Sequence, residues 1–151
     1  MEEEAEGRPY GPFLVAALFC RGFQASPQDT HLTGVGDLVT YRTPPVNVET
    51  KLVLALQAGE YYGTVEIDLR PFAPGCAPWR APDADVLRVV FDGSVRYATL
   101  PANFSVPFKG DGLYGVEVYL NGVFAVRSEF EVGPQPGPGP LPRMGMRPFR
   151  D

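Results

Sequence analysis

The clearest alternation of apolar and polar positions lies in residues 113–132, LYGVEVYLNGVFAVRSEFEV. Two apolar rows flank Asn121-Gly122, and both occupy even-numbered positions. Their members are Tyr114, Val116, Val118 and Leu120 before the pair, and Phe124, Val126, Phe130 and Val132 after it. A period of two around Asn-Gly predicts two antiparallel strands joined by a tight turn.

The register of this hairpin follows from the parity of the two rows. A two-residue loop would pair Leu120 with Val123 and would put apolar side chains beside charged ones on one face. A three-residue loop with Gly122 in the left-handed conformation restores the parity, because a bulge absorbs the extra residue. We therefore predict a bulged hairpin with a three-residue loop. The expected cross-strand pairs are Val118 with Phe124 and Val116 with Val126.

Further strands are predicted on both sides of a proline-rich loop at 71–85. The apolar run 13–20 is short and lies between Pro12 and Gly22, which favours a buried strand. Residues 31–41 predict a strand that is broken at its two glycines. The remaining predicted strands are 49–57, 62–70, 86–91, 95–100 and 104–108. Pro107 cannot donate a ladder hydrogen bond, so its side of the strand is expected at an edge or an end.

Short strands separated by turn residues, without a helical apolar stripe, predict an all-β domain. We expect an antiparallel β-sandwich of seven to nine strands, with a barrel as the alternative. The domain should span residues 12–132, after a flexible acidic arm at 1–11. Residues 133–151 form a proline- and glycine-rich tail that should be extended and semi-rigid.

The end of the tail combines basic and apolar side chains. These are Arg143, Met144, Met146, Arg147, Phe149 and Arg150. One hypothesis is an arm that docks on a neighbouring acidic subunit or on a protein partner. The alternative is a solubilising tail that binds nothing.

The formal charge of the chain is −5. Residues 1–10 contribute −3, residues 11–132 contribute −4, and residues 133–151 contribute +2. An acidic body argues against nucleic acid as a partner, because phosphate binding needs a basic face. The acidic start differs from a signal peptide, and an apolar run of about eight residues is too short to cross a bilayer. We expect a cytoplasmic protein without a membrane partner, with a virion as the other possible location.

The residues available for catalysis are few. His31 is the single histidine, and Cys20 and Cys76 are the two cysteines, so neither a Ser-His-Asp triad nor a zinc site is indicated. Cys20 is expected as a buried thiol, and a disulfide to Cys76 is left open as the less favoured alternative. We expect a protein that is not an enzyme and that has no cofactor.

Two ligand sites remain as hypotheses. Loop aspartates supply the oxygen ligands that calcium prefers, and the candidates are Asp83, Asp85 and Asp111. Exposed aromatic side chains can bind a sugar, and the candidates are Tyr61, Tyr62 and Trp79. Local hydrogen bonding in turns and packing at strand ends are the alternative roles for these residues.

Four segments together resemble a family of small uncharacterised bacterial β-sandwich proteins, classed as a domain of unknown function. They are LVAALFC, HLTGVGDLV, YGTVEIDL and the closing ANFSVPFKGDGLYGVEVYLNGVFAVRSEFEV. The resemblance covers residues 12–132 and implies an immunoglobulin-like or C2-like sandwich, without catalytic residues. The chain departs from the family pattern in the loop at 71–82 and in the tail.

These observations favour a non-enzymatic binding or assembly module that acts through its surface and its C-terminal arm, with a protein partner or another copy. One alternative is a carbohydrate- or calcium-binding module. The other is a structural or decoration protein of a phage or virion, because sandwiches with extended arms suit capsid lattices.

Overall fold

The protein is all-β in the residues described by the structure, a computed structural model that covers 10–25, 30–36, 38–79 and 86–135. The strands are β1 (Phe13–Cys20), β2 (Gly22–Ala25), β3 (Thr30–Thr33), β4 (Leu38–Tyr41), β5 (Asn47–Gln57), β6 (Gly63–Phe72), β7 (Leu87–Phe91), β8 (Tyr97–Pro107), β9 (Gly112–Leu120) and β10 (Val123–Pro134). The all-β prediction is therefore confirmed. No helix among these residues is long and apolar enough to cross a membrane.

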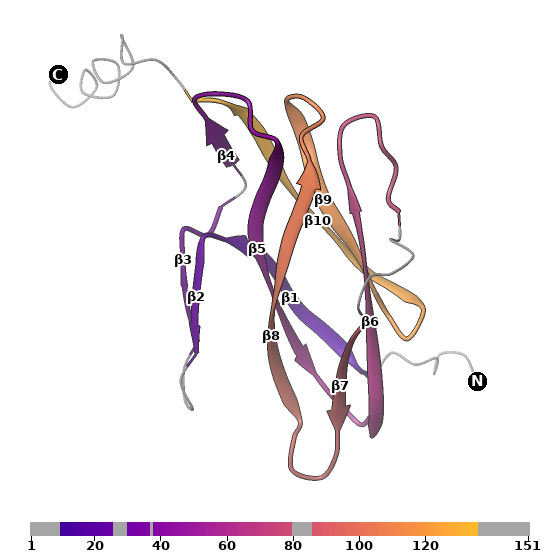
Figure 1. The fold of residues 1–151 in the computed structure, drawn as a ribbon. Helices are drawn as coiled ribbons and strands as arrows, with labels where there is room; N and C mark the ends of the chain where they lie inside the picture. The colour runs from indigo at the N-terminus through magenta and orange to yellow at the C-terminus, as the bar shows by residue number, and fades with distance from the viewer. Residues whose placement is uncertain (1–9, 26–29, 37, 80–85, 136–151) are drawn as a thin grey trace, which may run out of the picture.

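Two sheets form the layers of the fold (Figure 1). One has the strand order β1-β5-β8 and the other β4-β10-β9-β6-β7, while β2 and β3 form a small separate hairpin. The pairs are antiparallel except for β4 and β10, which run parallel along Glu131–Pro134. The prediction of a purely antiparallel arrangement is wrong for this pair. Parallel partners need a long connection, and most of the domain lies between these two strands in the sequence.

The core lies between the inner faces of the two sheets. Phe19, Phe104 and Phe130 meet there edge to face, with ring centroids 4.7 to 5.5 Å apart. Leu54 and Val118 are fully buried in the same cluster. Burial on this face explains the even-numbered apolar row of β9, because alternate side chains of a strand point to one face.

Strand β8 is longer than predicted. Residues 95–100 and 104–108 were expected as separate strands, but β8 runs through both as one element from Tyr97 to Pro107. It pairs with β5 alone, so it forms the edge of the three-stranded sheet. Pro101 and Pro107 are compatible with this edge, because neither has an N–H to donate to a ladder. The predicted edge position of Pro107 is confirmed, as is the break between β3 and β4.

The turn of the β9–β10 hairpin differs from the prediction. Leu120 pairs with Val123 across a two-residue loop, so the predicted three-residue loop is wrong. Asn121 and Gly122 both have positive φ, 49° and 83°, and Asn-Gly supports a two-residue turn of this kind because its twist matches that of the strands. The register shift lies between Phe124 and Val126, which places the bulge beyond the loop.

The bulge restores the parity inside the second strand. Val126 pairs with Val118 and Ser128 with Val116. The predicted partners, Phe124 for Val118 and Val126 for Val116, are therefore wrong. Phe124 pairs instead with Tyr119, whose side chain lies on the outer face of the sheet. The bulge thus removes Phe124 from the core row to which its even number assigned it.

Candidate binding cleft

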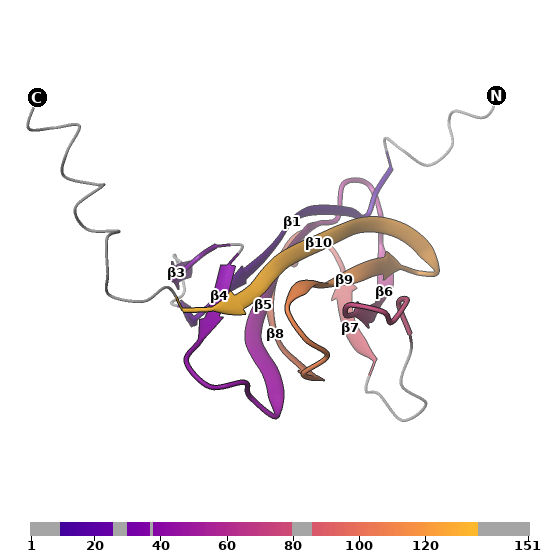
Figure 2. The same ribbon diagram turned by 90° about the horizontal axis from the view of Figure 1, so that it is seen from above.

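The two sheets meet along a seam between β1 and β10. Strand β1 pairs with β5 on one side, and β4 covers β10 only from Glu131 onwards. In the described part of the chain, the facing edges of β1 and of the preceding half of β10 are joined by no backbone ladder. The Ser128 hydroxyl bridges the seam by donating to the Ala17 carbonyl oxygen at 3.1 Å. Figure 2 shows β1 alongside the strongly curved β10. Unpaired strand edges are sites where another chain can add.

A cleft of about 720 Å³ opens at the start of this seam. It is lined by Gly11, Pro12, Phe13, Leu14, Tyr61, Leu120, Asn121, Val123, Phe124 and Ala125. The volume falls within the range of about 300–1,000 Å³ that is usual for ligand sites. A smaller hollow of about 340 Å³ lies further along the seam, where Ala17 and Leu18 face Ser128 and Glu129.

The β5–β6 turn holds the start of β1 at the cleft. The Glu60 N–H donates to the Tyr10 carbonyl oxygen at 2.8 Å. Gly59 has a φ of 63°, and a β-carbon there would lie 2.6 Å from the Phe13 ring. Glycine at this position therefore allows both the turn and the close approach of Phe13.

The hairpin tip is fixed to β6 on the other side of the cleft. The Asn121 N–H donates to the Glu66 carbonyl oxygen, and the Glu66 N–H donates to Asn121 Oδ1, each at 2.8 Å. Asn121 Nδ2 also donates to the Tyr61 hydroxyl at 3.3 Å, and that hydroxyl donates to the Thr64 carbonyl oxygen at 2.7 Å. Both walls are thus held by backbone contacts, and the cleft is formed without a partner.

Large apolar side chains are exposed at the tip. Val123 is 68% exposed and Phe124 is 51% exposed. The Phe124 ring meets the Tyr119 ring edge to face, with centroids 5.6 Å apart. Exposed apolar residues that gather beside a cleft mark a binding surface more often than isolated ones do.

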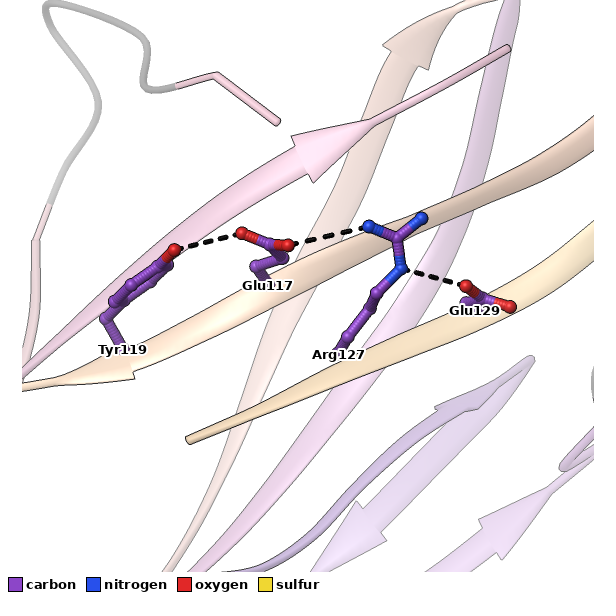
Figure 3. Close-up of polar contacts among 4 residues, drawn as sticks. All are labelled: Glu117, Tyr119, Arg127 and Glu129. Atoms are coloured by element: carbon purple, nitrogen blue, oxygen red, sulfur yellow. Dashed lines mark hydrogen bonds and ion pairs between the residues drawn. The ribbon is translucent and has the colours of Figure 1, made fainter. Parts of the chain in front are cut away.

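A row of polar contacts crosses the outer face beside Phe124 (Figure 3). The Tyr119 hydroxyl donates to Glu117 at 3.0 Å, which raises the pKa of Tyr119 because the bond favours the protonated phenol. Arg127 donates to Glu129 at 2.9 Å and to Glu117 at 3.5 Å. The bond to Glu129 is the main reason that the pKa of Arg127 is raised.

Aromatic faces complete this row. The Arg70 guanidinium lies 4.1 Å from the Tyr119 ring centroid and donates to Asp68 at 2.9 Å. The Arg127 guanidinium lies 3.8 Å from the Phe72 ring centroid. Arg70 and Arg127 each pair with a carboxylate two residues along their own strand, and the Arg127–Glu117 pair and the Arg70–Tyr119 contact join neighbouring strands across the outer face.

The predicted sugar-binding aromatics lie in different surroundings. Tyr61 lines the cleft, and its hydroxyl is engaged at the hairpin tip. Tyr62 is exposed, with the Arg96 guanidinium 4.1 Å from its ring centroid. Trp79 is half-buried against the core on the loop after β6, where its backbone N–H donates to the Pro71 carbonyl oxygen. Sugar binding by these residues stays a prediction.

The predicted calcium ligands are described only in part. Asp111 accepts a hydrogen bond from the Tyr41 hydroxyl at 2.6 Å, and this bond raises the pKa of Tyr41. Asp83 and Asp85 lie outside the described residues. Within those residues, no group of three or more His, Cys, Asp and Glu side chains could hold a metal ion.

The two cysteines and the histidine lie on separate parts of the fold. Cys20 is a buried free thiol, as expected, and Cys76 is also free, so the disulfide alternative is wrong. His31 lies in β3 and pairs with Gln24. The tail residues Arg143, Met144, Met146, Arg147, Phe149 and Arg150 lie outside the described residues.

The sequence did not indicate the cleft itself. Phe13 and Leu14 were assigned to a buried strand, and Phe124 was assigned to the core row of the hairpin. The signal that was available is the combination of Asn-Gly, which supports a two-residue turn, with an apolar row of the wrong parity. That combination requires a bulge inside the strand and an apolar residue turned outward.

Comparison with known proteins gives a distant structural likeness. No protein-family model matches the chain, and no curated protein matches it. The chain is similar to part of an alkylpurine DNA glycosylase of Pseudomonas fluorescens, solved bound to DNA that contains an abasic site analog. The TM-score is 0.41 and the identity 11%, and the similarity covers 78% of this chain and 30% of the glycosylase chain. The chain thus spans less than a third of that protein's length.

This neighbour corrects two expectations. It is an enzyme and it is bound to DNA, so the expectations that this protein is not an enzyme and does not bind nucleic acid are withdrawn. Both rested on an inventory of residue types and on total charge. A chain with a single histidine still has the carboxylates and tyrosines that other mechanisms use. A net charge describes the whole chain and leaves local basic surfaces undetermined.

Proposed function

We propose that the protein is a binding or assembly module of immunoglobulin-like or C2-like β-sandwich type, related to the bacterial family that its strand motifs resemble. Its contact surface is the cleft between the start of β1 and the β9–β10 hairpin tip. The supporting observation is the exposure of Val123 and Phe124 at a preformed cleft beside two open strand edges. The ligand that suits such a cleft is an extended segment of a protein, with apolar side chains for the cleft and backbone groups for the edges.

The geometry of the cleft supports a protein ligand in particular. Aromatic and aliphatic side chains are enriched at the centres of protein interfaces, where they form the contacts that contribute most to affinity. Phe124 has this position: its ring meets the Tyr119 ring, which in turn lies against the Arg70 guanidinium. The neighbouring ion pairs form the polar surroundings that usually enclose such a centre.

The proposal is tested by replacing Phe124 in the full-length protein. Phe124→Glu puts a charge at the cleft, and Val46→Glu is the matched control because Val46 is 85% exposed in the segment before β5. Each variant is purified with an affinity tag from the cells that make the protein, and the retained proteins and the amount of co-purified untagged protein are compared. We expect Val46→Glu to retain the same associations as the native protein and Phe124→Glu to lose them. Retention of every association by Phe124→Glu would falsify the proposal.

A further inference from the structure

We propose that the cleft receives the C-terminal segment of a second copy of this protein, with Met144 and Met146 entering it. This inference rests on the proposed function, because it names an occupant for the same cleft. It assigns self-assembly in which the tail of one molecule binds the β1–β10 seam of the next.

The sequence of the tail provides a segment suited to an open strand edge. Residues 143–147, RMGMR, lie between Pro142 and Pro148 and contain no proline. Every residue of this stretch can therefore donate a backbone hydrogen bond, whereas the alternating prolines before it cannot. In an extended conformation, Met144 and Met146 share one face and Arg143 and Arg147 share the other. One face suits an apolar cleft and the other suits solvent or acidic groups.

Methionine suits a cleft of this shape. Its unbranched side chain fills irregular apolar space, and its sulfur makes favourable contacts with aromatic rings. Phe13 and Phe124 supply such rings on the two walls of the cleft. The N-terminal residues 1–9 are less suitable, because they contain four glutamates and a single methionine.

Charge favours the same occupant. The cleft is lined by Gly11 and Pro12, which directly follow the acidic residues 1–10 with their net charge of −3. The tail at 133–151 carries +2. Opposite charges on the two segments steer their encounter and oppose binding of acidic segments.

The direction in which the chain leaves the fold favours a second copy over the molecule's own tail. The Gln135 N–H donates to the Tyr41 carbonyl oxygen at 2.7 Å, which continues the course of β10 away from the cleft. Gln135 lies beyond the end of β10, at most about 40 Å along this curved strand from Val123 in the cleft. Extended chain from Gln135 to Met144 spans at most about 32 Å, and it would have to reverse first. The tail of a neighbouring molecule can enter the cleft without this reversal and without this restriction on its reach.

The contact is heterologous, because the tail of one molecule meets the cleft of the next. Such contacts build open chains or closed rings of molecules, unless two molecules exchange tails and form a closed pair. The expected result is therefore an assembly that grows with protein concentration.

The test is sedimentation velocity on the full-length protein over a range of concentrations at low salt. We expect the weight-average mass to rise from the monomer value of 16.5 kDa to roughly double that or more at high concentration. The double variant Met144→Ser, Met146→Ser and the variant Phe124→Glu should both remain at 16.5 kDa, while Val46→Glu should behave as the native protein does. Raising the salt from about 0.1 M to about 1 M should weaken the association, because the Debye length falls from about 10 Å to about 3 Å.

The outcomes separate this inference from the proposed function. Association that survives the methionine substitutions but is lost in Phe124→Glu overturns the inference and retains the cleft as a contact surface. Association that survives both overturns the inference and counts against the proposed function. A native protein that stays monomeric at every concentration overturns the inference, while the co-purification experiment still decides the proposed function.

Discussion

The two ends of the β9–β10 hairpin have the same alternating pattern and different surroundings. At the open end, Tyr114 and Phe130 are buried to 0% and 1% exposure between the sheets. At the tip, Phe124 is 51% exposed, although it belongs to the same even-numbered row. The bulge between them accounts for the difference, because it reverses the face to which the row points. One end therefore stabilises the fold, and the other presents apolar surface beside a cleft.

The largest expected effect comes from truncating the aromatic ring at each end in turn. Phe130→Ala removes a ring packed against Phe19, Phe104 and Tyr114, and should lower the free energy of unfolding by about 3–5 kcal/mol. Phe124→Ala removes an exposed ring and should cost about 1 kcal/mol through its contact with Tyr119. Urea unfolding of the two variants measures both values. Equal losses at the two ends would contradict the division between stability and binding.

The buried hydroxyl of Tyr114 should give the next effect. It accepts from the Lys109 N–H and donates to the Gly110 carbonyl oxygen, both at 2.7 Å. Tyr114→Phe leaves these two backbone groups without that partner and should cost about 1–3 kcal/mol in thermal or urea unfolding. The matched control is Tyr97→Phe, since Tyr97 is 73% exposed and should change stability little. A cost below that of the control would show that the loop takes up other hydrogen bonds.

The turn at the tip should give a smaller effect. Gly122 has a φ of 83°, so Gly122→Ala forces an alanine into the left-handed region at a cost of about 1–2 kcal/mol. Gly93 lies in the turn between β7 and β8 without a positive φ and with open space around it, which makes Gly93→Ala the control. Urea unfolding compares the two variants. If they match, the two-residue turn is not what fixes the register at the tip.

The smallest effect concerns the ionisation of Tyr119 beside Phe124. Its pKa is raised by the bond to Glu117, so the folded state favours the protonated phenol. The stabilisation is complete below the unfolded pKa of about 10 and is lost as pH rises through the higher folded pKa. Glu117→Gln should lower the pKa of Tyr119, as followed by carbon-13 NMR of the tyrosine rings. An unchanged pKa would assign the shift to a cause other than this carboxylate.

The strands could be predicted from the local sequence pattern, but the pairing between them could be predicted only in part. The alternation in β6 and β9 and the proline positions in β8 were sufficient to predict strands and an edge. The parallel contact of β4 with β10 depends on residues far apart in the sequence, which no local pattern encodes. Parity predicted a bulge but not its position. A bulge at Gly122 and a bulge at a later residue of the second strand restore parity equally well.

The cleft could not be predicted for a related reason. Its walls come from the start of β1, the β5–β6 turn and the hairpin tip, which the packing of two sheets brings together. Phe13 and Phe124 have the sequence pattern of core residues, and their exposure depends on the seam and the bulge. Tyr61 is predicted as a loop aromatic that could bind sugar, and its place at the fixed wall of this cleft depends on contacts with Asn121, 60 residues away in the sequence.

The most direct test of the central claim is a dilution series of the full-length, nitrogen-15-labelled protein followed by amide NMR. The account predicts that shifts dependent on concentration gather at the cleft, on Phe13, Leu14, Val123, Phe124 and Ala125. The turn around Asp92 and Ser94, at the other edge of the sheet, should not respond. Shifts that appear at that turn and spare the cleft, or association that leaves the cleft amides unchanged, would contradict the account.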